Sequence, residues 1–335
     1  MKRTIIVLFL YFILLIITFY PAIIYACELT VDNLNVLEKT PNNSETKTVE
    51  TINTITTKWP GLGMCLFSNF SIRRFNKDID ILLTNGFTEL RIDIPDYQND
   101  TLLTDSKSAV QAAVAKGAKV VWGVSSNSHN NTDFLITEES WPNFRQAILD
   151  AAQWAQSNGV YEFQIGNEEE WHVDGTTLTA VQIIENLKSI ASEVKTIFTN
   201  GKISYTCFTD YIDYWIMVGK GDIDILAFNM YRGGNDNYNN DWKRIITKMV
   251  NGFGVESTYI TEFNISWSSL DDYSTDEKIQ AVALKEMIDY IKDSGIKKAF
   301  YFIYRDTPLF TDYGARKYDG TYRLLWDHAL LNSGL

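Results

Sequence analysis

Two glutamates lie at the ends of short apolar segments, where a fold can bring side chains from distant parts of the chain together. Glu168 ends the segment 161–168, and Glu262 is next to last in the segment 258–263. Cleavage of a glycosidic bond uses two carboxyl groups: one protonates the leaving oxygen, while the other attacks the anomeric carbon or activates water. If the fold unites these two side chains, their types predict acid–base chemistry on a sugar bond.

Eight short apolar segments alternate with stretches of helical periodicity along the chain. The expected strands span residues 61–67, 88–94, 118–125, 161–168, 202–208, 224–231, 258–263 and 298–305. Eight strand–helix repeats predict an α/β fold, a closed (β/α)8 TIM barrel in one domain. An open doubly wound sheet usually carries a glycine-rich phosphate loop after its first strand, and here Ser68-Asn69-Phe70 follows instead.

The stretches between the strands have the spacing of helices packed on one face. In the last of them, the residues predicted to face the barrel are Ile279, Val282, Ala283, Met287, Ile288 and Ile291. In the stretch 140–159, the predicted inward residues are Ala147, Ile148, Ala151 and Trp154. Glycines that end helices commonly adopt a left-handed conformation, and Gly86, Gly117, Gly159 and Gly295 are predicted to do so.

The side chains that reach the barrel interior follow from the alternation of side chains along a strand. The polar and small residues predicted to face inward are Glu89, Arg91, Asp93, Gln164, Gly166, Glu168, Asn229, Tyr231 and Glu262. By the same rule, Thr261 falls on the opposite face from Glu262. Active sites of such barrels form at the C-terminal ends of the strands, so both glutamates should emerge at that mouth. An adjacent cation such as Arg91 favours the ionised form of a carboxyl group.

The triplets that contain the two glutamates are similar to motifs of a known family. Gly166-Asn167-Glu168 closes the fourth expected strand, and Thr261-Glu262-Phe263 closes the seventh. This pattern resembles clan A of the glycoside hydrolases, also called the 4/7 superfamily. The resemblance covers the barrel from about Trp59 to the C-terminus.

Membership of that clan implies a role for each matching residue. Glu168 matches the acid/base, and Glu262 matches the nucleophile. Asn167 matches the residue that binds the 2-hydroxyl of the sugar, while Arg91 and Tyr231 match residues that attend the nucleophile. The resemblance also implies a retaining reaction, in which the carboxyl groups lie about 5–5.5 Å apart.

Two positions depart from the clan, and two tryptophans are further candidates for substrate contact. Asn229 stands where many members have His, and Tyr304 is the candidate for an aromatic position that many members fill with Trp. Both are predicted to contact the substrate. Trp171 and Trp267 follow the two catalytic strands, where flat aromatic rings can stack on sugar faces.

Structural roles compete with these functional ones. The run of Glu168, Glu169 and Glu170 is also compatible with a solvated acidic loop. Arg91 and Glu262 are also compatible with a purely structural ion pair. A second function is likewise open: a surface-displayed carbohydrate-binding barrel without turnover, since fold alone does not fix function.

Composition narrows the partners that the chain can have. A net charge of −12 disfavours nucleic acid and anionic membrane surfaces. Cys65 and Cys207 lie in apolar segments and are expected to be buried free thiols, and the three histidines form no metal-binding pattern. We therefore expect a monomer that binds carbohydrate, with neither a metal nor another cofactor.

The first residues have the composition of an export signal. Lys2 and Arg3 precede an uncharged apolar run over 4–26, and residues 27–58 are largely polar. Cleavage, retention as a membrane anchor and lipidation at Cys27 all remain open. We expect a signal or anchor over 1–26, a linker over 27–58, a catalytic barrel over 59–335, and an extracellular or cell-surface location.

Removal of the residues before Trp59 is expected to leave a soluble, folded domain. The stretch 38–58 has almost no large apolar residues, so it cannot bury enough surface to offset the entropy lost on ordering. Circular dichroism and thermal melting of the truncated protein measure this. A truncated chain that fails to fold would show that the segment is structural.

Overall fold

The computed structural model describes residues 58–68, 71–126, 136–171, 178–232, 238–265, 277–308 and 313–334. The predicted signal or anchor, most of the predicted linker, and Trp267 lie outside these residues.

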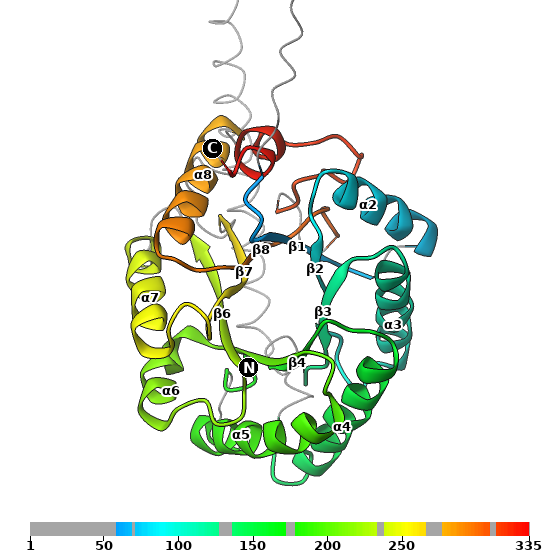
Figure 1. The fold of residues 1–335 in the computed structure, drawn as a ribbon, viewed down its shortest axis with the longest axis vertical. Coiled ribbons are helices and arrows are strands. Elements are labelled where there is room, and N and C mark those ends of the chain that lie inside the picture. Colours follow the sequence, from blue (N-terminus) through cyan, green and yellow to red (C-terminus); the bar gives the residue numbers. More distant parts are fainter. Residues whose placement is uncertain are drawn as a thin grey trace, which may run out of the picture. The chain divides into compact units, whose positions relative to one another are not determined.

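Eight parallel strands form a closed barrel in sequence order (Figure 1). They are β1 (Leu62–Leu66), β2 (Glu89–Ile92), β3 (Lys119–Gly123), β4 (Glu162–Asn167), β5 (Lys202–Cys207), β6 (Ile225–Arg232), β7 (Ile260–Ile265) and β8 (Ala299–Tyr301). Strand β1 pairs with both β2 and β8, which closes the sheet. The barrel prediction is confirmed. The strands fall within the expected ranges, except that β6 and β7 run one and two residues further.

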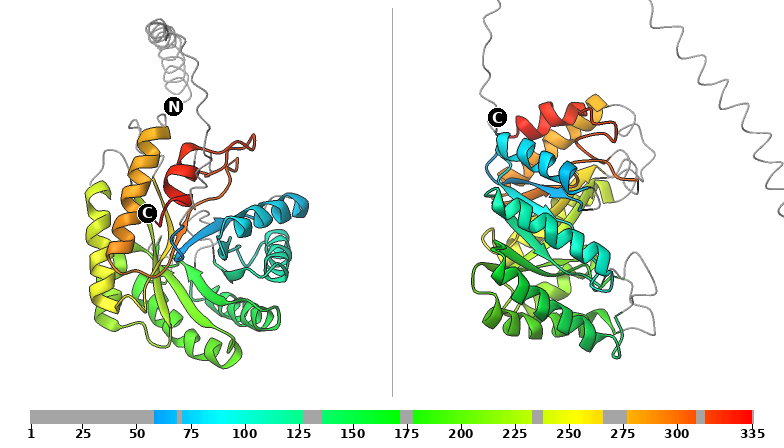
Figure 2. Two further views of the ribbon diagram at one scale, coloured as in Figure 1. Left: turned by 45° about the horizontal axis from the view of Figure 1, so that its top comes forward. Right: turned by 90° about the vertical axis from the view of Figure 1, so that its right-hand side faces the viewer.

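An outer ring of helices covers the strands (Figures 1 and 2). It comprises α2 (Ile72–Thr84), α3 (Asp100–Ala115), α4 (Trp141–Ser157), α5 (Ala180–Ile197), α6 (Ile212–Val218), α7 (Tyr238–Phe253) and α8 (Glu277–Asp293). A π-helix, Trp326–Leu331, contacts α8 near the C-terminus. The four glycines predicted to end helices all have positive φ angles, between 71° and 86°.

The buried face of α8 differs from the predicted one. Met287, Ile288 and Ile291 are buried as expected, but Ile279 and Val282 are 40% and 71% exposed. The observed face consists of Gln280, Ala281, Ala283, Leu284, Met287, Ile288 and Ile291. The prediction for Ile279 and Val282 was wrong, because the side of the helix that carries Gln280 and Leu284 faces the barrel instead. In α4, Ile148 and Ala151 are buried, whereas Ala147 and Trp154 are half-buried.

A charged cluster occupies the barrel interior at the N-terminal ends of the strands. Lys298 lies 2.7 Å from Glu162 and 3.5 Å from Glu89. Tyr259 donates a hydrogen bond to Glu162. Because each charge has an opposite partner, the cluster fills this end of the barrel without an unpaired buried ion.

Bulges in β4 and β7 change which side chains enter the interior. Gln164 pairs with Ser204 and Asn167 with Thr206, so β4 advances three residues while β5 advances two. In β7, Ile260 pairs with Phe228 and Glu262 with Asn229, which again inserts one residue. An inserted residue shifts the alternation by one position.

Because of these bulges, the predictions that Gly166 faces inward and that Thr261 faces outward are wrong. A Cβ atom on Gly166 would approach Tyr205 and Glu169, which lie behind the strands. Asn167 instead faces the interior with Gln164, and Thr261 joins Glu262 there. Simple alternation holds only where the register is continuous.

Gly123→Ala is expected to destabilise the barrel. A Cβ atom there would overlap the carbonyl oxygen of Gln164 on β4, and a backbone atom cannot move aside as a side chain can. Overpacking of this kind costs about 1–3 kcal/mol of unfolding free energy, measured by chemical denaturation.

Gly252→Ala is the matched control for this variant. The nearest atoms to its added carbon belong to the side chain of Ile216, which must shift but is partly exposed, and alanine favours the helix. We expect a smaller loss of stability than for Gly123→Ala. Equal stability of the two variants would contradict the close approach of β3 and β4.

Candidate active site

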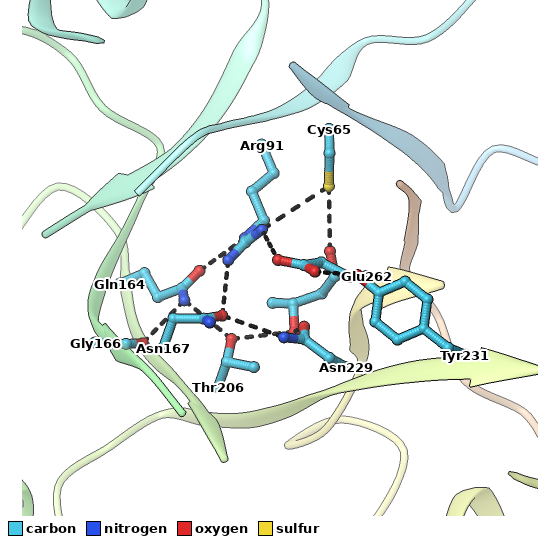
Figure 3. A network of polar contacts seen from close by, with 10 residues as sticks. Cys65, Arg91, Gln164, Gly166, Asn167, Thr206, Asn229, Tyr231 and Glu262 are labelled. Atoms are coloured by element: carbon cyan, nitrogen blue, oxygen red, sulfur yellow. Dashed lines mark hydrogen bonds and ion pairs between the residues drawn. The ribbon is translucent and has the colours of Figure 1, made fainter. Parts of the chain in front are cut away.

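Arg91 occupies the centre of a polar network inside the barrel (Figure 3). Its Nη1 donates to Oε1 of Glu262 at 2.7 Å, its Nη2 to Oδ1 of Asn167 at 3.0 Å, and its Nε to Oε1 of Gln164 at 3.0 Å. Burial opposes the charge of this guanidinium, but the carboxylate of Glu262 raises the pKa of Arg91 overall. One cation therefore fixes side chains from both β4 and β7.

Glu262 receives a donor on each oxygen. Arg91 contacts Oε1, and the hydroxyl of Tyr231 donates to Oε2. Burial and the negative charge of Glu262 raise the pKa of Tyr231, which keeps this hydroxyl protonated and able to donate. The surroundings of Glu262 therefore stabilise negative charge on its carboxyl group, and the side chain remains 12% exposed.

Glu168 has surroundings of the opposite kind. It follows the last residue of β4 with a φ angle of +56° and is 9% exposed. Burial, and then the charges of Glu262 and Glu170, raise the pKa of Glu168 well above its ordinary value. A hydrogen bond from Asn229 and the charge of Arg91 oppose this only in part. The protonated form of Glu168 is thereby favoured.

A second set of hydrogen bonds orients the amide of Asn229. Thr261 donates to Oδ1 of Asn229 at 2.9 Å, and Thr206 donates to Thr261 at 3.0 Å. Nδ2 of Asn229 donates to Oδ1 of Asn167 at 3.4 Å. Asn229 thus connects Asn167 to Glu168, and Gln164 completes the set by donating to Thr206.

Cys65 and Cys207 are buried free thiols, as predicted. Cys65 lies next to Arg91, with its Sγ 3.4 Å from the carbonyl oxygen of Thr261. Burial raises the pKa of the Cys65 thiol to about 12, so it stays neutral beside Arg91. Cys207 is fully buried at the end of β5, and burial raises its pKa as well.

Tyr304 does not reach this network. It is fully buried, its hydroxyl hydrogen-bonds with that of Tyr322 at 2.9 Å, and its ring packs against Trp326. The prediction that it contacts substrate disagrees with this position: it assumed that Tyr304 ends the eighth strand, but β8 ends three residues earlier, at Tyr301. The aromatic residue beside the site is Phe302, whose ring meets Tyr231 edge-on at 5.9 Å.

Trp171 lies after β4, close in sequence to Glu168. It is 37% exposed, and its ring stacks on Phe208 at 4.9 Å with an interplanar angle of 10°. This support fixes the orientation of a partly exposed indole face. The arrangement suits a platform for a sugar ring.

Sequence reasoning missed the environment of Glu169 and Glu170. Both are buried, at 1% and 0% exposure, so the interpretation of this run as a solvated loop is wrong. Their surroundings combine Ser126, from the segment after β3, with residues from β5 and α6, which no local pattern brings together. A glutamate triplet directly after an apolar strand was the available signal.

Among the residues that the structure describes, no cluster of His, Cys, Asp and Glu is arranged to hold a metal ion. In that same part of the chain, every helix is too short or too polar to cross a bilayer.

Sequence comparison and structural comparison give different results. The sequence matches no protein-family model and no curated protein. An exo-β-1,4-mannosidase of Opitutaceae bacterium strain TAV5 matches with a TM-score of 0.60 at 11% identity, over 82% of this chain and 58% of that one. An endocellulase of Pyrococcus horikoshii in complex with cellotetraose matches with a TM-score of 0.59 at 13% identity, over 81% and 90%.

A β-galactosidase of Marinomonas ef1 also matches, with a TM-score of 0.56 at 11% identity, over 81% of this chain and 58% of that one. The chain thus spans little more than half the length of the mannosidase and the galactosidase. The likeness establishes a shared fold: this chain has the barrel architecture found in solved glycoside hydrolases.

Proposed function

We propose that this chain is a retaining β-glycoside hydrolase that cleaves O-glycosidic bonds of an extracellular polysaccharide or oligosaccharide. The observation that carries the proposal is the contrast between the two glutamates. Glu262 accepts from a cation and a hydroxyl, while burial and like charges favour the protonated form of Glu168. A carboxyl group held in its protonated form suits the acid, and one that accepts hydrogen bonds from two donors suits the nucleophile.

The first step forms a covalent intermediate. A carboxylate oxygen of Glu262 attacks the anomeric carbon, and the bond to the leaving oxygen breaks as Glu168 transfers its proton to that oxygen. In the second step, Glu168, now a carboxylate, takes a proton from water. The water oxygen attacks the anomeric carbon, the ester bond breaks, and Glu262 returns as a carboxylate. Two displacements retain the anomeric configuration.

Neighbouring residues support these steps. Arg91 and Tyr231 orient the carboxylate of Glu262 and stabilise its charge between turnovers. Asn167 is held by Arg91 through Oδ1, and its amide group is assigned to the 2-hydroxyl of the sugar. Trp171 provides a stacking surface beside Glu168. Asn229 and Phe302 are assigned to substrate contact within the same interior.

The substrate class and the location rest on separate support. The solved endocellulase that shares the fold binds cellotetraose, and the exposed face of Trp171 suits a neutral sugar. The basic and apolar leader supports export to the cell surface or beyond. A carbohydrate-binding barrel without turnover has weaker support, because Arg91, Asn167, Tyr231 and both glutamates form one complete set.

Alanine variants of the two glutamates are expected to respond differently to azide. Glu262→Ala loses turnover of all substrates, because no nucleophile remains. Glu168→Ala retains turnover of aryl glycosides whose leaving group needs no proton. Added azide should convert Glu168→Ala reactions to the glycosyl azide of retained configuration, and Glu262→Ala reactions to the inverted one. Proton NMR of the anomeric centre distinguishes the products.

Glu162→Gln is the matched control for these variants. Glu162 is buried at the start of β4, the strand that Glu168 follows, but it lies in the charged cluster away from the network, where Lys298 keeps Glu89 as a partner. It should retain wild-type turnover and configuration. An exchange of the two azide products would reverse the assigned roles, and inversion by the wild-type protein would exclude the double displacement.

The pH profile is expected to depend on the leaving group. Because the pKa of Glu168 is raised, its acid form persists above the ordinary range and is lost as pH rises through that pKa. The value of kcat/KM for oligosaccharides should therefore fall on the alkaline side. An aryl glycoside with an activated leaving group should lack this limb, since its first step needs no acid. Identical alkaline limbs for both substrates would assign the limb to another group.

A further inference from the structure

Two carboxyl groups that the proposed reaction does not use lie directly behind the acid/base. Glu169 and Glu170 follow Glu168 in sequence, yet they turn away from the barrel interior and contact the layer between strands and helices. Both are almost completely buried. Ionisable side chains are rarely placed so deeply without a set of partners.

Glu170 has hydrogen-bond donors on both carboxyl oxygens. Its Oε1 accepts from the backbone N–H of Phe208 at 2.8 Å and from Nε1 of Trp215 at 3.2 Å. Its Oε2 accepts from the hydroxyl of Tyr205. Three donors and no acceptor form a receptor for a carboxylate rather than for a neutral acid.

Tyr205 connects this receptor to the backbone next to the acid/base. It lies on β5 and is fully buried. While its hydroxyl donates to Glu170, the same oxygen accepts from the backbone N–H of Glu169 at 2.9 Å. Because the Tyr205 hydroxyl points its hydrogen at Glu170, its oxygen lone pairs remain available to accept from the N–H of Glu169.

The backbone on each side of Glu168 is fixed in the same way. The N–H of Asn167 donates to the carboxylate of Glu169 at 3.0 Å, and the N–H of Glu168 donates to the carbonyl of Thr206 at 2.8 Å. With the bond from Glu169 to Tyr205, three successive N–H groups are held. This matters because Glu168 has a left-handed backbone, which a non-glycine residue adopts only where its surroundings impose it.

We propose that Glu170 and Tyr205 are positioning residues for Glu168: they hold the left-handed turn that sends its side chain into the barrel, and the carboxylate of Glu170 places a buried negative charge behind it. The inference rests on the proposed function in that Glu168 is taken as the acid. It goes further by assigning the control of that acid to a pair outside the barrel interior.

The charged groups around Glu168 show why Glu170 has this effect. Glu262 faces it from β7, Arg91 from β2 and Glu170 from its own segment, and the two carboxyl groups raise its pKa while Arg91 lowers it. Tyr231 on β6 and Cys207 on β5 are neutral neighbours, because burial raises the pKa of each. The carboxyl group of Glu169 points to Ser126 instead.

Burial also raises the pKa of Glu170, to about 7, and its three donors oppose the rise. Tyr205 and Cys207 face it from β5, and burial holds both in the neutral form. Removal of its charge would leave Glu262 as the principal anion acting on Glu168. The pKa of Glu168 should then fall.

Glu170→Gln tests the electrostatic part of the inference in the full chain. The substitution keeps the shape and removes the charge. The alkaline limb of kcat/KM for an oligosaccharide should move about one pH unit toward acid, the scale of a shift from one nearby charge. Glu162→Gln should leave the limb unchanged, because it also removes a buried carboxyl bonded to a tyrosine, but from the cluster around Lys298. An unmoved limb in a folded Glu170→Gln protein would overturn the inference.

Tyr205→Phe tests the positioning part. It removes the acceptor for the N–H of Glu169 but retains the carboxyl group of Glu170. We expect kcat for oligosaccharides to fall at least tenfold, with a smaller loss for activated aryl glycosides. Equal losses for the two substrates would contradict a role exerted through the acid. If Glu170→Gln does not fold, Trp215→Phe removes one donor and should move the limb in the same direction by a smaller amount.

Infrared titration separates this inference from the proposed function. Difference spectra between the wild type and Glu168→Gln identify the C=O stretch of protonated Glu168, which disappears as the group ionises. That titration should move toward acid in Glu170→Gln whether or not any glycoside is cleaved. If the protein cleaves no glycoside, only the proposed function is contradicted. If the titration of Glu168 is unchanged in Glu170→Gln, only the inference is contradicted.

Discussion

The ion pair between Arg91 and Glu262 is the interaction on which the interior of this barrel depends. A charged pair in a protein core has lost most of its hydration, and removing one partner of such a pair typically costs about 3–5 kcal/mol. Arg91 therefore requires an acceptor for each of its remaining N–H directions. Gln164 and Asn167 provide two of them from β4. The result is a polar interior in which strands β2, β4 and β7 are joined by one guanidinium.

That arrangement requires β4 and β7 to be irregular. A regular strand presents only every second residue to the interior, yet Thr261 and Glu262 both contact it. The inserted residue in each strand makes this possible and also brings Asn167 beside Arg91. Bulges of this kind redirect side chains next to active sites at a local loss of sheet hydrogen bonding.

Three consecutive glutamates lie in three environments around the left-handed backbone of Glu168. Glu168 enters the barrel, Glu169 binds Ser126 in the segment after β3, and Glu170 contacts Tyr205 and Trp215 of α6. The charge of Glu170 behind the strand and the charge of Glu262 inside the barrel thus both act on Glu168. The electrostatic environment of Glu168 therefore does not depend on residues inside the barrel alone.

The sequence alone determined the barrel, because eight alternating segments and the spacing of their apolar residues express local propensities and one-sided burial. It also indicated Arg91, Tyr231 and the two glutamates as one group, since strand ends in a parallel barrel meet at one edge, and the resemblance to clan A added Asn167. Their contacts in the network, and the pKa of Glu168, agree with that grouping.

Only the tertiary structure decided the details that depend on partners distant in sequence. The bulges arise from pairing with β5 and β6, so alternation misplaced Gly166 and Thr261. The position of Tyr304 depends on its contacts with Tyr322 and Trp326. The buried face of α8 depends on the surface that the helix covers. The environments of Glu169 and Glu170 combine three elements of the fold. Local sequence specifies where a strand ends, but burial and hydrogen-bond partners there are properties of the assembled barrel.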